Sequence, residues 1–201
     1  MTVSRKKTSP TWTDVKAKLA EFDRVGLLGV VQDLYAASKD NQAFLHARFG
    51  LGEDALGPYK ATIHRWLWPD VVKNQSPSVS AAKRAIAEYK KASGQPEGLA
   101  GLMVFYCECA AGFGREYGVA DGGYFDALVR MFEQALKASD ALETDQRDTM
   151  LNRLDTVRRI SRNFGYGVDY AMDGLLARYG GDRRAGFRTI IPNGPTKQWP
   201  A

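Results

Sequence analysis

The chain has few of the residues from which metal sites, disulfide frameworks and reactive centres are made. Among its 201 residues are only two histidines and two cysteines. Cys107 and Cys109 are separated by one residue, so on a helix they point about 200° apart and can face neither each other nor one ligand. A disulfide framework is therefore excluded, and reduced thiols predict a cytoplasmic protein.

Long apolar stretches are also missing. The longest, residues 99–107, is about half of the roughly 20 residues that a membrane span needs. The first ten residues are polar and basic, with no apolar segment of a secretory signal behind them. We therefore expect no membrane association.

Known catalytic and cofactor motifs are missing as well. His46 and His64 stand on different predicted helices, without an acidic or Cys partner at ligand spacing. The glycines at 112, 114 and 118 superficially resemble a phosphate-binding loop, but they end an apolar helix, whereas that loop needs a strand before it and a helix N-terminus after it. We therefore predict no metal and no cofactor, and a non-enzymatic role is favoured.

What the sequence does contain is helical spacing of apolar residues almost throughout, with no sustained β alternation. It predicts an all-α protein, a multi-helix bundle or short α-solenoid of about eight helices with no sheet. Residues 27–35, for example, place Leu27, Leu28, Val31, Leu34 and Tyr35 at helical spacing after a capping Asp23. The segment 99–113 is apolar on nearly every side, which is typical of a central helix.

Three regions follow along the chain. Residues 1–10 are expected to be a mobile basic leader, and residues 180–201 a mobile basic tail that contains three prolines. Residues 11–179 are expected to form a single helical domain, with a candidate break between sub-lobes near residues 74–80.

Positive charge is unevenly distributed. The net charge is +5, yet residues 11–179 sum to −1, because the leader and the tail each carry a net +3. Within the body, basic residues gather on two predicted helices, and residues 116–145 sum to −5. The candidate binding residues for nucleic acid or a partner are Lys60, Lys83, Arg84, Lys90, Lys91, Arg158, Arg159 and Arg162.

Two interpretations of these cations stay open. Aromatics interleaved with Lys and Arg are what single-stranded nucleic acid needs, but Ile63, Trp66 and Leu67 also fit one core-facing side of a helix, and Tyr89 continues another apolar stripe. The cluster at 158–162 either binds phosphate or pairs with the acidic 116–145 surface of the same or another copy, and pairing within one chain is the simpler interpretation.

Glu108 is the one candidate for a catalytic group. It lies within the most apolar predicted helix, where a carboxylate needs a partner or a proton. One interpretation is a structural pair with Arg or Lys, or a hydrogen bond from a tyrosine. The other is an acid or base in a pocket.

A set of short elements occurs in order between residues 30 and 125. They are Leu34-Tyr35, Ala47-Arg48-Phe49, Tyr59-Lys60, Pro69, Ala82-Lys83, Ile86 to Lys91, Leu102-Met103, Glu108, Gly112-Phe113 and Tyr117-Gly118. In these elements the chain resembles a bacterial family catalogued as domain of unknown function 6155. The resemblance covers roughly half of the chain. It implies an all-helical protein, and it supplies neither an activity nor catalytic residues.

Three functional hypotheses remain. The first is a non-catalytic module that binds a protein partner through a helical surface. The second is weak, sequence-nonspecific and salt-sensitive binding of nucleic acid through the basic ends and basic helix faces. The third is an enzyme of unrecognised type centred on Glu108. The sequence identifies neither the partner nor the oligomeric state.

Overall fold

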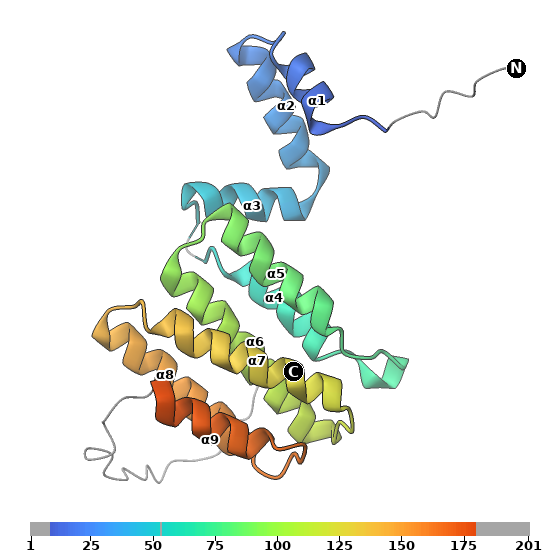
Figure 1. Ribbon diagram of the computed structural model, residues 1–201. Coiled ribbons are helices and arrows are strands. Elements are labelled where there is room, and N and C mark those ends of the chain that lie inside the picture. The colour runs from blue at the N-terminus through green and yellow to red at the C-terminus, as the bar shows by residue number, and fades with distance from the viewer. Residues whose placement is uncertain (1–8, 53, 180–201) are drawn as a thin grey trace, which may run out of the picture.

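The structure is a computed structural model that describes residues 9–52 and 54–179, and within them it is all-α with no strand (Figure 1). The predicted fold class is thus confirmed. The leader at 1–8 and the tail at 180–201 lie outside the described residues. The helices are α1 (Trp12–Leu19), α2 (Arg24–Ala37), α3 (Lys39–Phe49), α4 (Gly57–Leu67), α5 (Val79–Ala92), α6 (Pro96–Tyr117), α7 (Gly122–Ser139), α8 (Thr144–Ile160) and α9 (Val168–Tyr179), with a short 3₁₀ turn at Val71–Lys73.

Capping residues explain most helix boundaries. The carboxylate of Asp23 accepts from the Gly26 amide at 2.7 Å, and Asp121 does the same for Gly123 at 2.8 Å. Gly50 ends α3 in the left-handed conformation, which a residue without a Cβ adopts readily. Helix α8 begins at Thr144, and Glu143 stands at its cap position.

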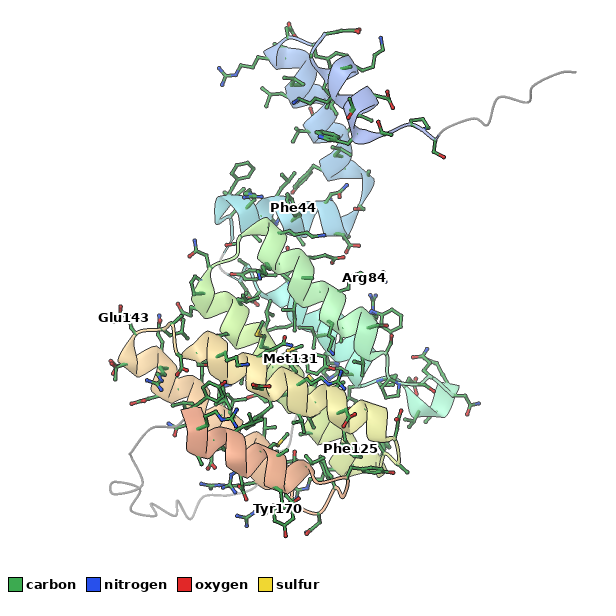
Figure 2. The ribbon with its side chains drawn as sticks, viewed as in Figure 1. Phe44, Arg84, Phe125, Met131, Glu143 and Tyr170 are labelled. Atoms are coloured by element: carbon green, nitrogen blue, oxygen red, sulfur yellow. The ribbon has the colours of Figure 1, made fainter. Side chains whose placement is uncertain are left out.

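The core is built around α6, as the sequence predicts for its most apolar segment. Helices α4, α5, α7 and α8 all pack against α6, and α9 packs against α7. Tyr106 from α6 and Phe125 and Phe132 from α7 are among the largest fully buried side chains. Figure 2 shows Phe125 within this packed body.

The loop near residues 74–78 does not part the helices on either side of it. Helices α4 and α5 pack directly against each other across this loop, and both contact α6. Helix α3 joins this group through α5, where Ala47 is buried and the Arg48 guanidinium donates to the Lys91 carbonyl at 2.9 Å.

Helices α1 and α2 are placed differently from the rest. They extend beyond α3, away from the body formed by α4 to α9 (Figure 1), and neither helix has a buried residue. The apolar residues that stand at helical spacing in α2 are therefore exposed. Trp66, assigned to a core-facing side, is 37% exposed and lies against the Arg65 guanidinium.

None of the helices in the described ranges combines the length and the apolar character that crossing a bilayer requires.

Candidate interaction surface

The most unusual surface belongs to α1 and α2, which we call the N-terminal arm (residues 12–37). Nine large apolar side chains of the arm are exposed, with Val25 at 75% and Leu28 at 60%. Only two residues of α2, Arg24 and Asp33, are charged. The nine are Trp12, Val15, Phe22, Val25, Leu27, Leu28, Val31, Leu34 and Tyr35.

The area of this surface exceeds what monomers usually leave open. A fully exposed large apolar side chain presents on the order of 150–200 Å², so the nine exposed fractions amount to about 700–900 Å² per chain. The largest apolar patch of a typical monomer covers about 300–600 Å², and larger patches mark sites of interaction. The arm is therefore the first candidate for a functional surface.

Hydrogen bonds fix the turn that carries the arm. The Asn41 side chain donates to the Leu34 carbonyl at 2.6 Å, and the Gln42 side chain donates to the Tyr35 carbonyl at 3.2 Å. These bonds satisfy carbonyls in the last turns of α2, which have no partner within the helix. The Tyr35 hydroxyl also lies 3.0 Å from Nε2 of His46, so this histidine helps to join α2 to α3.

A second candidate surface is the basic face of α5, which consists of Lys83, Arg84, Lys90 and Lys91. The pairs 83/90 and 84/91 are each seven residues apart, which places all four on one side of the helix, opposite its buried residues. Figure 2 shows Arg84 pointing away from the body. In the described part of the chain none of the four forms an ion pair, and neither does Glu88 on the same helix.

The cations near the end of α8 are arranged otherwise. Arg158 is mostly buried and binds Asp155 at 2.8 Å and Asp173 of α9 at 2.9 Å. Arg159 binds the second oxygen of Asp155 at 2.6 Å. Arg162 is exposed and makes no ion pair among the described residues. The cluster therefore pairs within the chain, but with neighbouring carboxylates rather than with the acidic 116–145 surface.

Glu108 lies at the α6–α8 contact and is half-buried, with its side chain 34% exposed. Its two carboxylate oxygens accept from Nε and Nη2 of Arg153 at 2.8 and 2.7 Å. This hydrogen bonding raises the pKa of Arg153, against the opposing effect of burial. Because both oxygens have a charged donor, the geometry matches the structural interpretation of Glu108.

Arg153 also lines a cleft of about 530 Å³ beside this pair, together with Lys60 from α4. Tyr89, Gln95 and Glu143 also line it. Lys60 is thus placed apart from the basic face of α5, since it faces a cleft that it shares with Arg153. The predicted cations lie on separate helices, mainly α4, α5 and α8. Helix α6 packs against both α5 and α8, so these cations do not form one continuous surface.

Metal-ligating and nucleophilic groups do not converge in the described ranges. No group of three or more His, Cys, Asp or Glu side chains is placed to hold a metal ion there. Cys107 and Cys109 are both buried and unpaired, and burial raises the pKa of Cys109 to about 12 and that of Cys107 well above its ordinary value. Raised pKa values leave almost no thiolate near neutral pH, so neither thiol is an activated nucleophile.

Sequence reasoning did not single out the arm, although the sequence held a signal. At 3.6 residues per turn, the apolar residues of α2 spread over roughly 220° of its circumference, wider than a core-facing stripe on one side requires. The described residues of one chain leave this wide surface open. Comparisons of the chain with protein-family models, with curated proteins and with solved structures find no match.

Proposed function

We propose that the chain is a non-catalytic interaction module that binds a protein partner through the N-terminal arm. The observation that supports this proposal is the set of nine large apolar side chains that the arm exposes in the absence of any buried residue of its own. Covering such a surface removes apolar area from water, which is the main driving force of protein association.

The composition of the arm favours a protein partner over a lipid surface. Helices that lie in a membrane interface usually carry several Lys or Arg residues on their polar side. Residues 12–37 carry Lys16, Lys18 and Arg24, but four carboxylates offset their charge, and α2 has no cation besides Arg24. An apolar helix surface with few charges is instead typical of a helix that packs against other helices.

The proposal is tested by capture from nuclease-treated cell lysate with the full chain immobilised. Val25→Glu/Leu28→Glu places two carboxylates on the exposed surface of α2, and we expect it to abolish capture of any partner that binds the arm. Val72→Glu is the matched control, because Val72 is 88% exposed on the 3₁₀ turn outside the arm. Crosslinking must map the captured protein to residues 12–37. Equal capture by the arm variant would contradict the proposal.

The second candidate function is weak binding of single-stranded nucleic acid, and it is favoured by the cations on the basic face of α5, which form no ion pair among the described residues. Four phosphate contacts predict that the logarithm of affinity falls with the logarithm of salt concentration with a slope of about −3. We expect Lys83→Gln/Lys90→Gln to reduce that slope in an anisotropy titration with a labelled 30-nucleotide strand, and Lys16→Gln/Lys18→Gln to leave it unchanged. Binding that does not respond to salt would reject this function. The basic ends at residues 1–10 and 180–201 belong to this hypothesis as well, and of them residues 1–8 and 180–201 lie outside the described residues.

Two buried free thiols fit a reducing compartment, which supports the predicted cytoplasmic location. The resemblance to the bacterial family 6155 stays a prediction, since no comparison tests it.

A further inference from the structure

We propose that the partner of the N-terminal arm is a second copy of this chain, and that α1 and α2 of two copies form a four-helix bundle. This inference rests on the proposed function, because it specifies which protein covers the arm. It adds a symmetric dimer, in which the same surface of each copy meets itself.

The exposed area is the first argument for a second copy. A stable interface of standard size buries about 800 Å² on each partner. The nine apolar side chains of the arm expose about 700–900 Å² by themselves. One arm therefore matches the contribution of one partner, and a second arm supplies an equal apolar surface without any other component.

The number of helices is the second argument. Two helices cannot enclose a core between them, and in the arm they do not, since the residues of α1 and α2 are all exposed or half-buried. A four-helix bundle surrounds an apolar centre with short connections. The residues of two arms provide those four helices. Gly29 of α2 has open space beside it, so another helix can approach closely at that point.

Charge is the third argument. Residues 12–37 contain Lys16, Lys18 and Arg24 against four carboxylates, so two arms carry a small net charge and repel each other weakly. The Lys18 ammonium is already paired with Glu21 at 3.0 Å. The surface of α2 thus offers apolar contact to a like surface, with no strong charge that would require a partner of opposite sign.

The placement of the arm allows this pairing. Figure 1 shows α1 and α2 beyond α3, with α4 to α9 on the far side of that helix. Two arms can therefore meet while the two bodies stay on the outside of the dimer. A dimer formed through α4 to α9 would instead bring the larger parts of both copies into contact.

The test is sedimentation equilibrium of the full chain from about 1 to 100 µM. We expect a mass of twice 22.2 kDa for the wild type at micromolar concentrations. Val25→Glu/Leu28→Glu places four carboxylates in the apolar interface of a dimer and should weaken association at least about 100-fold. Val72→Glu should dimerise like the wild type, because its side chain lies outside the arm.

Hydrogen exchange at two concentrations locates the interface independently of any variant. Amides of α1 and α2 should exchange more slowly at 100 µM than at 1 µM, while amides of α6 and α7 should not change. Circular dichroism and thermal melting are the controls, and both should show that the two glutamate variants keep a folded body.

The outcomes separate this inference from the proposed function. A wild type that stays monomeric at 100 µM, or an arm variant that still dimerises, overturns the inference. If a monomeric wild type nevertheless captures another protein through residues 12–37, the proposed function stands without the dimer. If a monomeric chain captures no protein through the arm, both the dimer and the proposed function are rejected. This holds also if residues 180–201 of the same chain are found to cover the arm.

Discussion

Removing the charge of Glu108 should destabilise the protein by weakening the contact between α6 and α8. Glu108 and Arg153 lie 45 residues apart in sequence and share two hydrogen bonds of 2.8 and 2.7 Å. Glu108→Gln keeps the size of the side chain but leaves the guanidinium opposite an uncharged amide. The loss therefore reports on the ion pair rather than on packing.

The magnitude follows from the exposure of the pair. An exposed ion pair contributes about 0–1 kcal/mol, whereas breaking a buried one costs about 3–5 kcal/mol. Both side chains are 34% exposed, between these limits. We expect Glu108→Gln to lower the free energy of unfolding by about 1–2 kcal/mol, which lowers Tm by about 3–6 °C for a chain of this length.

Chemical denaturation of four proteins measures this pair directly. The wild type, Glu108→Gln, Arg153→Gln and the double variant form a cycle whose coupling energy should be about 1 kcal/mol. Glu88→Gln is the control, because Glu88 is exposed and forms no ion pair among the described residues, and it should change stability by less than about 0.5 kcal/mol. A coupling energy near zero would refute the structural role of Glu108 and return it to the candidates for a pocket acid or base.

Three further predictions concern the body. Phe132→Ala removes a fully buried ring from α7 and should cost about 3–5 kcal/mol in a urea titration, and a loss below 1 kcal/mol would contradict the described core. Asp121→Ala removes the cap that accepts from the Gly123 amide, and it should cost about 1 kcal/mol, with Asp121→Asn restoring most of the loss. Burial raises the pKa values of Cys107 and Cys109 above those of unfolded thiols. The stability of the fold should therefore be unaffected by these thiols below about pH 9, where unfolded thiols ionise, and should fall as the pH rises toward 12. The same thiols should react with a disulfide reagent only after denaturation, and reaction of the folded protein at neutral pH would contradict their burial.

The helices could be predicted because their signals are local. Asp23 caps α2 and Gly50 ends α3, as their positions beside apolar periodic segments indicate. The central place of α6 also follows from its own residues, since a helix that is apolar on most sides must be surrounded. These two boundaries, the helical class and the central element therefore need no knowledge of which segments meet.

Partners across helices could not be predicted in the same way. Glu108 was a candidate because of its setting, but nothing in the spacing of the chain identifies Arg153 as its partner. Arg158 was expected to be able to meet the acidic 116–145 surface, and it binds Asp155 one turn before it and Asp173 on the next helix instead. Nearby carboxylates hold these cations at short range, and their effect outweighs the summed charge of a more distant surface.

The arm shows why periodicity identifies an apolar stripe without identifying what covers it. The stripe of α2 has the spacing of a core face, yet no residue of the arm is buried in a single chain. Its apolar side chains therefore contribute little to the free energy of unfolding of the monomer, while Phe132 and its neighbours contribute most of it. Stability measurements consequently report on α4 to α9, and association measurements report on α1 and α2. A substitution such as Leu28→Glu should weaken association. At a concentration where the chain is monomeric, it should leave the free energy of unfolding almost unchanged.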